Sequence, residues 1–303
     1  MKGIVFHDVG EVRLATDLPE PEITNDSGDV IVRIHRSGIC GSDLHPYHGK
    51  EAIKRGTILG HEFVGDIVQV GSQVENFQCG DRVLSPFTTS CGHCFFCKEG
   101  LSSRCVDWQL FGFLDPEDDH NPRALQGAQT ELIRVLQADS TLLALPESIS
   151  MSQGILLGDN FTTGFYCAQR AEIHANGLYV VIGCGAVGLS AIVAARFFGA
   201  KHILAIDNLS FRQQRAERLG AMVVYPEEAA EKIREMAENL GRPAADSVME
   251  AVGNPSAQAL AFELVRAGGI ISSVGLNMAP SFTFSPVDTY NKNITYKYQE
   301  DVL

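Results

Sequence analysis

The sequence contains no apolar run that approaches the roughly 18 residues of a membrane-spanning helix. Residues 1–10 carry charged and polar side chains where a secretory signal needs an apolar core. We therefore expect no membrane association and a cytoplasmic location. Thiols stay reduced in that compartment, so the 8 cysteines are expected to serve metal binding or catalysis and not disulfide bonds.

Positive charge is also scarce. The chain has 24 Lys and Arg against 37 Asp and Glu, which gives a net charge of −13. Nucleic acids and anionic membranes attract basic surfaces, so we expect neither as a partner. A hydrophobic content of 45% is ordinary for a globular protein, and 303 residues are enough for two domains that each bury a core.

The chain changes character near residue 158. Before it, short strands are separated by Gly, Asp and Pro, as in residues 30–35, 63–70 and 81–84, which is typical of a barrel or sandwich. After it, strands and helices alternate. Residues 178–182 form a continuous apolar run, as expected for a buried parallel strand, and residues 186–198 have helical spacing. We also expect strands over residues 202–206, 247–252 and 269–274 and helices over residues 211–219 and 227–240. This alternation predicts a doubly wound α/β domain.

Four cysteines form the strongest metal signal. Cys91, Cys94, Cys97 and Cys105 follow the spacing C-x2-C-x2-C-x7-C in a loop rich in charged residues. Four thiolates are the ligand set of a structural zinc, which leaves no open coordination position. An iron–sulfur cluster is the main alternative, although its cysteines usually have other spacing. We predict a zinc that holds structure and does no chemistry.

A second group of metal-binding residues is more dispersed. Cys40 follows one predicted strand, and His61 and Glu62 precede another. Each residue alone is compatible with ordinary packing or a turn. Together they are a thiolate, an imidazole and a carboxylate, which is the kind of ligand set that a catalytic zinc with an open position uses.

The third motif is Gly183-Cys184-Gly185-Ala186-Val187-Gly188, which lies between the apolar strand and a helix. Its glycines allow the backbone to approach a pyrophosphate at the helix N-terminus. Asp207 follows the next predicted strand, where it would bind the adenosine ribose and repel a 2′-phosphate. This predicts NAD as the cofactor, although the nearby Arg212 weakens the preference over NADP.

Together these residues resemble the zinc-containing medium-chain dehydrogenase/reductase family. The resemblance rests on Gly60-His61-Glu62, the cysteine loop, Gly80-Asp81-Arg82-Val83 and the glycine motif, in that order. It implies a GroES-like β-rich catalytic domain over residues 1–157, followed by a Rossmann NAD-binding domain over residues 158–303. Among its branches, the formaldehyde dehydrogenase-like and polyol dehydrogenases are the most similar. The family forms dimers and tetramers, so the resemblance implies a homodimer or homotetramer.

The resemblance also implies roles for single residues. Asp159 occupies the position of the third catalytic zinc ligand, and Glu62 is a nearby carboxylate that can also approach the ion. Thr163 lies against the nicotinamide. Ser42 and His45 stand where the family has a hydroxyl and a histidine that carry the substrate proton to solvent. Phe87, Trp108, Leu110 and Phe111 are compatible either with pocket walls or with core packing.

The family pattern continues with a helix and strand beyond the Rossmann domain, whereas this sequence has Gln299-Glu300-Asp301 and ends at Leu303. Two functions therefore compete. The first is a zinc-dependent oxidoreductase that transfers a hydride between NAD and a small alcohol, polyol or aldehyde hydrate. The alternative is a truncated, inactive homologue that binds zinc and nucleotide. A redox protein with an iron–sulfur cluster is a third hypothesis.

Overall fold

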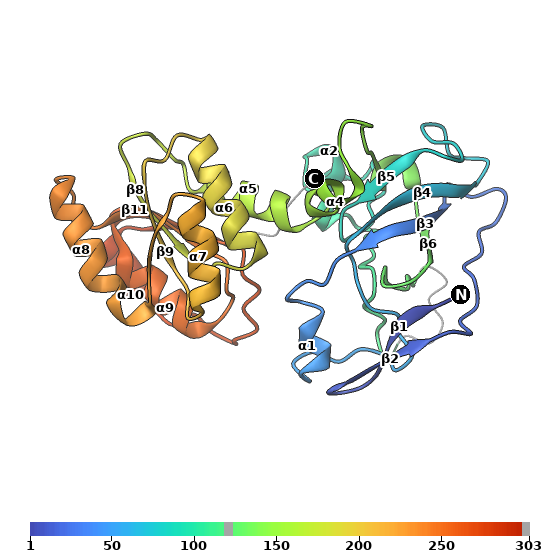
Figure 1. Cartoon of the computed structure of the whole chain (residues 1–303), viewed down its shortest axis with the longest axis horizontal. Helices are drawn as coiled ribbons and strands as arrows, with labels where there is room; N and C mark the ends of the chain where they lie inside the picture. Colours follow the sequence, from blue (N-terminus) through green and yellow to red (C-terminus); the bar gives the residue numbers. More distant parts are fainter. Residues whose placement is uncertain (118–123, 299–303) are drawn as a thin grey trace. The chain divides into compact units, whose positions relative to one another are not determined.

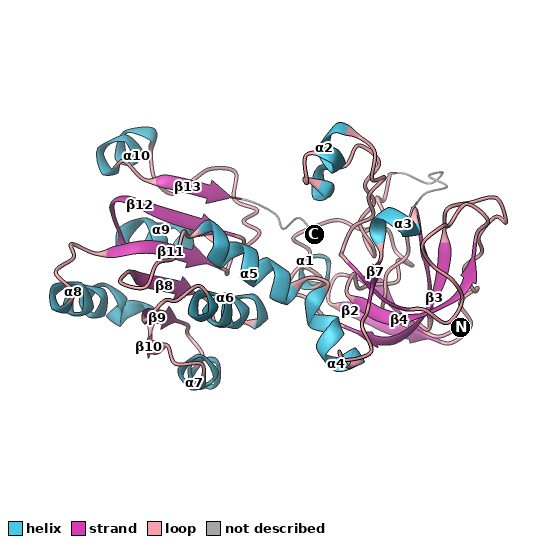
Figure 2. Ribbon diagram, turned by 90° about the horizontal axis from the view of Figure 1, so that it is seen from above, coloured by secondary structure: helices cyan, strands magenta, loops and turns pink. Residues whose placement is uncertain are grey.

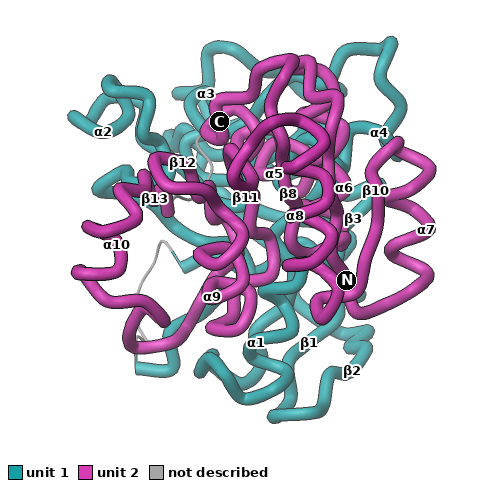
Figure 3. The backbone as a smooth tube through the Cα atoms, turned by 90° about the vertical axis from the view of Figure 1, so that its left-hand side faces the viewer, with its two compact units in different colours: residues 1–159, 302–303 teal, residues 160–301 magenta. Residues whose placement is uncertain are grey.

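A computed structural model of the protein describes residues 1–117 and 124–298 (Figure 1). The chain forms two compact units, of which the first runs from Met1 to Asp159 and the second begins at Asn160 (Figure 3). The segment Gln299-Glu300-Asp301 lies outside the described residues. Within the described ranges, no helix combines the length and the apolar character that crossing a lipid bilayer requires.

The first unit contains a five-stranded sheet in the order β6-β3-β4-β5-β7, with every neighbouring pair antiparallel. Its strands are β3 (Val30–Ser37), β4 (Phe63–Val70), β5 (Arg82–Ser85), β6 (Leu132–Val135) and β7 (Leu143–Ala144). Val30, Val32, Ile67 and Val83 project from it into one core, which also contains Phe111. Because inward-facing apolar residues recur along each strand, the short strands predicted from the sequence pack as a sheet with one buried face.

Short elements complete the first unit. The strands β1 (Gly3–Asp8) and β2 (Glu11–Ala15) form a separate antiparallel pair. The helical segments are α1 (Leu44–Tyr47), α2 (Phe95–Lys98), η1 (Ser102–Arg104), α3 (Ala138–Thr141), α4 (Met151–Gly154) and η2 (Ile155–Leu157). None of these helices exceeds four residues, so the first unit is built mainly from strands and loops.

The second unit is a six-stranded parallel sheet in the order β10-β9-β8-β11-β12-β13, which Figure 2 shows as a stack of arrows. Its strands are β8 (Leu178–Ile182), β9 (His202–Ile206), β10 (Met222–Val224), β11 (Ala245–Glu250), β12 (Val265–Ser273) and β13 (Thr295–Tyr298). Its helical segments are α5 (Asn160–Arg170), α6 (Ala186–Phe197), α7 (Ser210–Arg218), η3 (Pro226–Glu228), α8 (Ala229–Asn239), α9 (Pro255–Leu264) and α10 (Pro286–Lys292).

Helices bury both faces of the parallel sheet. On β8, Leu178, Val180 and Ile182 belong to the core cluster that contains residues of α8 and α9. Tyr179 and Val181 belong to the opposite cluster, with residues of α5 and α6. A strand covered on both faces needs apolar side chains at every position, which explains the continuous apolar run. The predicted doubly wound α/β architecture is confirmed.

Candidate active site and zinc centres

The dispersed ligand residues meet at one end of the five-stranded sheet. Ser37, at the end of β3, pairs with Phe63, at the start of β4, so the residues after β3 and those before β4 lie side by side. Phe63 also pairs with Ser85, at the end of β5. A Cβ placed on Gly158 would lie 2.5 Å from the Ser85 carbonyl oxygen, so the segment that ends the first unit reaches the same end of the sheet.

Four donor groups converge there. Ligand atoms of Cys40, His61, Glu62 and Asp159 all lie within 4.8 Å of one another. His61 Nε2 is 3.4 Å from Asp159 Oδ2. Zinc bonds of about 2.0–2.3 Å place two ligand atoms of a tetrahedral ion about 3.3–3.8 Å apart, so this spacing suits the ion. The structure therefore brings together the four residues for which the sequence predicts a catalytic zinc.

The electrostatics at His61 also suit a cation. The side chain is almost fully buried, and burial alone would lower its pKa. Contacts with Asp159, Asp43 and Cys40 outweigh burial, so the pKa of His61 is raised well above its ordinary value. The buried surroundings of His61 therefore favour positive charge, which a bound metal cation would supply.

Asp43 is a further residue of the site that the sequence analysis did not identify. It is 3% exposed, and its Oδ2 accepts the Cys40 backbone N–H at 2.8 Å. Its Oδ1 lies 3.1 Å from His61 Nδ1. A carboxylate on the second imidazole nitrogen orients a metal-binding histidine and makes it more basic. The local signal was an Asp three residues after a candidate cysteine ligand, although nothing in the sequence placed it beside His61.

Ser42 and His45, the two residues of the predicted proton path, follow the proposed ligand Cys40 closely in the sequence. The Ser42 hydroxyl is 3.4 Å from His61 Nε2, the nitrogen that faces Asp159. His45 lies in α1, and its Nδ1 is buried without a hydrogen-bond partner among the described residues. Burial lowers the pKa of His45, and the nearby Glu51 only partly opposes this shift. His45 is therefore a predominantly neutral imidazole at pH 7.

Glu62 occupies space that only a glycine at position 38 leaves open. A Cβ on Gly38 would lie 2.1 Å from Glu62 Oε2 and 2.8 Å from its Cδ. The Gly38 backbone N–H donates to the Glu62 carbonyl oxygen at 3.1 Å, which extends the pairing of β3 and β4 by one step. The carboxylate of Glu62 thus lies directly over the backbone that leads to Cys40.

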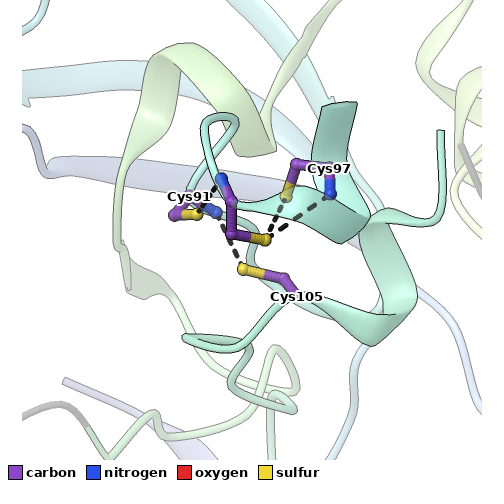
Figure 4. Close-up of side chains that lie close together, drawn as sticks. Cys91, Cys97 and Cys105 are labelled. Atoms are coloured by element: carbon purple, nitrogen blue, oxygen red, sulfur yellow. Dashed lines mark hydrogen bonds between the residues drawn. The ribbon is translucent and has the colours of Figure 1, made fainter. Parts of the chain in front are cut away.

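The four-cysteine loop is compact. Ligand atoms of Cys91, Cys94, Cys97 and Cys105 lie within 4.8 Å of one another, and Figure 4 shows the labelled side chains converging. The Cys94 and Cys97 sulfur atoms are 3.6 Å apart. Backbone N–H groups point at the sulfur atoms, as when Cys91 donates to Cys105 Sγ at 3.2 Å. This is a closed set of four thiol ligands, and it fits a tetrahedral zinc.

Two thiols of this loop differ strongly in their pKa values. Backbone N–H groups of Cys97 and Val106 lower the pKa of Cys94 to about 6. Burial and the neighbouring Cys94 raise the pKa of Cys97 to about 12. One thiolate is therefore stabilised at neutral pH, whereas a second would repel it. A divalent cation removes that repulsion, which is why such a cluster favours a metal.

The glycine motif lies between β8 and α6. A Cβ on Gly188 would lie 1.7 Å from the Gly183 carbonyl oxygen, so only glycine allows the helix to pack so closely on the turn. Asp207 follows β9 directly and is 8% exposed. Its Oδ2 accepts the Cys184 N–H at 2.8 Å and lies 3.7 Å from Arg212 Nη1. The acidic residue is therefore held against the glycine turn, with one guanidinium beside it.

The remaining predicted residues fall in different surroundings. Thr163 lies in α5 of the second unit. Phe111 is fully buried and its ring packs edge-on against Phe63, so it is a core residue. The ring of Phe87 instead lies with its centroid 6.5 Å from that of His61. The ring centroid of Phe113, a residue that the sequence analysis did not single out, lies 6.2 Å from the ring centroid of His61.

The sequence matches the patterns of two known families. Residues 26–147 match the family described as "Alcohol dehydrogenase GroES-like domain", and residues 186–298 match "Zinc-binding dehydrogenase". Zinc-type alcohol dehydrogenase B of Aspergillus flavus is 39% identical, over 97% of this chain and 68% of its own. The medium chain reductase/dehydrogenase ucsI of an Acremonium species is 39% identical, over 96% of this chain and 98% of its own.

Solved structures extend these similarities to the fold. Alcohol dehydrogenase TADH from Thermus sp. ATN1 superposes with a TM-score of 0.90 at 35% identity, covering 99% of this chain and 85% of its own. The fold, the ligand clusters and these matches define a zinc-dependent oxidoreductase with a Rossmann domain. The chain belongs to the zinc-containing medium-chain alcohol dehydrogenase/reductase family. The comparisons lend no support to the inactive homologue.

Proposed function

We propose that the chain is an NAD-linked zinc alcohol dehydrogenase, with a catalytic domain over residues 1–157 and an NAD-binding domain over residues 158–303. The observation that carries the proposal is the convergence of Cys40, His61, Glu62 and Asp159 at one end of the sheet, with Ser42 beside them. The overall reaction removes a hydride from the carbinol carbon and a proton from its oxygen, giving a carbonyl product and NADH. Its substrate is a small alcohol, a polyol or an aldehyde hydrate.

Cys40, His61 and Asp159 are the proposed ligands of the catalytic zinc, and Glu62 is the neighbouring carboxylate. A thiolate, an imidazole and a carboxylate leave one position for an outside ligand, which is the requirement of a catalytic metal. When bound, zinc supplies a Lewis acid for the hydroxyl oxygen and NAD supplies the hydride acceptor. The chain itself fixes the ligand geometry through Asp43, which is in contact with both Cys40 and His61.

The proton leaves through Ser42 and His45. The Ser42 hydroxyl can accept a proton from a substrate oxygen and donate its own onward, because a hydroxyl both donates and accepts. His45 suits the outer end of this path because its pKa is lowered and its Nδ1 is buried without a partner among the described residues. A neutral imidazole nitrogen of this kind is ready to accept a proton.

The cofactor site is proposed around Gly183, Gly185, Ala186, Val187 and Gly188, with Thr163 against the nicotinamide. The backbone N–H groups at the start of α6 suit a pyrophosphate. Asp207 suits the adenosine ribose and disfavours a 2′-phosphate, so NAD is preferred over NADP. Arg212 partly balances that charge from 3.7 Å. The four cysteines of the loop hold a second, structural zinc.

The family resemblance further supports a homodimer or homotetramer, and we propose separately that the enzyme acts in the cytoplasm. β13 supports an assembly of copies, because it is the last strand of its sheet and pairs with β12 alone among the described residues. An edge strand has unpaired backbone groups that a second chain can bind.

The proposal is tested by metal content and turnover together. Protein purified without added zinc is expected to contain two zinc ions per chain by elemental analysis and to form NADH from NAD and an alcohol. Cys40→Ala is expected to lose one zinc and all turnover while keeping its NAD affinity. Cys94→Ala is expected to lose the other zinc and to unfold at lower temperature, because a structural metal contributes folding free energy.

Cys79→Ala provides the matched control, since Cys79 is an exposed cysteine outside both clusters. It should keep both ions, its stability and its activity. A single zinc per chain that is lost with Cys94→Ala, together with no turnover, would support the inactive homologue. Iron and sulfide in place of zinc would support the iron–sulfur hypothesis.

A further inference from the structure

A buried carboxylate that the proposed reaction does not use lies at the end of β11. Glu250 is the last residue of that strand and is 1% exposed. Its Oε1 accepts the backbone N–H groups of Val252 at 2.7 Å and Gly253 at 2.8 Å. Its Oε2 accepts the hydroxyl of Ser273, at the end of β12, at 2.7 Å. These three hydrogen bonds replace the water that the carboxylate loses when it is buried.

Glu250 lies where the strand order of the parallel sheet changes direction. From β8 the chain continues through β9 to β10 on one side of the sheet, and from β11 it continues through β12 to β13 on the other (Figure 2). Glu250 pairs with Ile182, the last residue of β8, across this switch. Doubly wound sheets bind their ligands outside the carboxyl ends of the strands at such a switch. The buried carboxylate is therefore placed at the edge of the sheet that carries the proposed cofactor site.

The β11 loop (residues 251–253) contacts the glycine motif directly. The Ala251 N–H donates to the Ile182 carbonyl oxygen at 3.0 Å. A Cβ on Gly183, the first glycine of the motif, would lie 2.6 Å from Val252 Cγ2 and 3.3 Å from the Ala251 carbonyl oxygen. The β11 loop thus packs against the turn at which the pyrophosphate is proposed to bind, and a change in this loop would alter the surroundings of Gly183.

The β12 loop (residues 274–276) packs against the other side of the β11 loop. Gly253 has a φ of +74°, and a Cβ there would lie 2.4 Å from the Leu276 carbonyl oxygen. The N–H groups of Val274 and Gly275 both donate to the Glu250 carbonyl oxygen, at 3.0 Å and 3.2 Å. Glu250 therefore connects the two loops twice, through its main chain and through its side chain.

We propose that Glu250 is a positioning residue for the proposed cofactor site, whose carboxylate holds the β11 loop against Gly183 in the conformation that receives NAD. The inference rests on the proposed function, because NAD is its ligand. Two N–H groups that share one carboxylate oxygen fix the loop before the cofactor arrives. A site that adopts its binding conformation for only part of the time loses apparent affinity in the same proportion, so this preorganisation strengthens binding.

NAD affinity tests the proposal without turnover. Isothermal titration of the zinc-containing full chain with NAD, in the absence of an alcohol, gives the dissociation constant of each variant. Glu250→Ala leaves two buried N–H groups without their acceptor, so the loop should leave its position. If the binding conformation is then populated about one tenth of the time, the dissociation constant rises about tenfold, which is the smallest increase we expect.

Glu250→Gln is the conservative variant that should restore binding. Its amide oxygen can accept the N–H groups of Val252 and Gly253, and its amide nitrogen can donate to the Ser273 hydroxyl. These neutral hydrogen bonds are weaker than those to a carboxylate by about half, so we expect a dissociation constant within about threefold of the wild type. A role through hydrogen bonding therefore separates Glu250→Gln from Glu250→Ala.

Ser247→Ala is the matched control for damage to the strand. Ser247 lies in β11, is 3% exposed, and donates its hydroxyl to the Ala171 carbonyl oxygen at 2.7 Å. Its loss leaves a buried acceptor unsatisfied, as Glu250→Ala leaves donors, but away from the glycine motif. Ser247→Ala should unfold at lower temperature and keep the NAD affinity of the wild type.

Amide hydrogen exchange without NAD gives a second readout. In Glu250→Ala the amides of Val252 and Gly253 should exchange at least about tenfold faster than in the wild type, whereas Ser247→Ala should leave them unchanged. Ser273→Ala keeps the carboxylate and removes one of its three hydrogen bonds. It should accelerate the same two amides to a smaller extent, and it tests the contact even if Glu250→Ala does not fold.

The failures are distinguishable. If Glu250→Ala binds NAD as tightly as Ser247→Ala, or if Glu250→Gln binds it as weakly as Glu250→Ala, the positioning role is wrong and the dehydrogenase function stands. The same holds if the amides of Val252 and Gly253 exchange at the wild-type rate in both Glu250→Ala and Ser273→Ala. If wild-type protein that contains two zinc ions does not bind NAD, the proposed function fails, and the role of Glu250 fails with it.

Discussion

Asp43 Oδ1 lies 3.1 Å from His61 Nδ1, while the other imidazole nitrogen of His61 faces Asp159. The carboxylate thereby determines which nitrogen is available to a metal. Its second oxygen accepts the backbone N–H of Cys40 at 2.8 Å. One buried side chain thus positions two of the three proposed zinc ligands, although it is not itself a ligand.

Asp43→Asn is therefore expected to weaken the catalytic zinc while preserving the fold. An amide can still accept the Cys40 N–H, but it cannot support the imidazole as a carboxylate does. Changes of this kind typically cost about 10- to 100-fold in metal affinity or activity. Zinc affinity measured with a competing chelator, together with kcat/KM, checks the prediction.

Asp26→Asn serves as the control, because Asp26 is exposed and is neither a proposed ligand nor a neighbour of one in the sequence. It should match the wild type in both measurements. Equal zinc affinity for Asp43→Asn and Asp26→Asn would show that Asp43 does not position the ligands.

Gly38→Ala is expected to displace the Glu62 carboxylate. The added Cβ would lie 2.1 Å from Oε2, which is far inside van der Waals contact. Overpacking of this kind costs about 1–3 kcal/mol of stability. Glu62→Ala removes the atoms that clash most, so Gly38→Ala should cost much less in that background. Thermal unfolding of the two single variants and the double variant measures this coupling. Additive effects on stability would contradict the proposed contact.

The pH dependence of alcohol oxidation should reflect His45. Its pKa is lowered by burial, so the imidazole stays neutral when the pH falls through its ordinary value of about 6.5. The neutral form accepts the substrate proton, so turnover should decline only as the pH falls through the lowered pKa. His45→Gln should reduce kcat near neutral pH and remove this acidic limb. Initial rates measured from about pH 5 to about pH 9 test this prediction, because that range includes the titration of histidine. An unchanged acidic limb in His45→Gln would exclude His45 from the proton path.

The same shift has a consequence for stability whose sign is opposite to that of a histidine held in an ion pair with a carboxylate, whose pKa would be raised. The unfolded chain takes up the His45 proton near the ordinary pKa, whereas the folded chain takes it up only at lower pH. Between these two pKa values the unfolded state binds more protons. His45 therefore lowers the free energy of unfolding as the pH falls through that window. His45→Gln should therefore show a smaller loss of stability than the wild type when the pH is lowered through it.

Asp207→Asn is expected to reduce the preference for NAD over NADP. Asparagine keeps an oxygen for the Cys184 N–H, which Asp207 now binds at 2.8 Å, so the glycine turn should stay intact. The negative charge that repels a 2′-phosphate is lost, while Arg212 remains beside the site. We expect the ratio of kcat/KM for NAD to that for NADP to fall at least about tenfold, since hydrogen bonds to charged groups are worth about 1.5–3 kcal/mol. An unchanged ratio would place the discrimination elsewhere.

Much of the second unit could be predicted because its strands are buried on both faces. The strands expected over residues 178–182 and 202–206 coincide with β8 and β9. β11 begins at Ala245, two residues before the expected start, because Asp246 interrupts the apolar pattern. In the fold, Asp246 accepts the Leu178 N–H at 2.8 Å and a hydrogen bond from Arg266 at 2.8 Å. A buried polar residue with distant partners cannot be recognised from its local sequence.

Helix α9 was missed for a different reason. Asn254 accepts the Ala257 N–H at 2.8 Å, and Pro255 is the first helical residue, so a start signal was present. The helix is nevertheless alanine-rich and weakly amphipathic, so it lacks the strong periodicity on which helix predictions rest. Its packing against the sheet stabilises it.

The candidate site could be predicted only in part. The cysteine loop is local in sequence, so residue types and spacing were sufficient to group its four members. Cys40 and His61 could be paired by residue type, but the contact of Asp43 with His61 depends on how β3 and β4 align. Asp159 entered only through the family resemblance, because nothing in its local sequence distinguishes it from a loop aspartate.

Asp159 is the last residue of the first unit, and Asn160 begins the second. If Asp159 is the third ligand, as proposed, the last residue of the first unit carries part of the chemistry. Any exchange of nucleotide-binding modules between relatives would then also exchange a metal ligand unless the crossover falls after residue 159. Chimaeras joined after residue 157 would inherit the third ligand from the incoming module, and with it the type of donor atom at the catalytic centre.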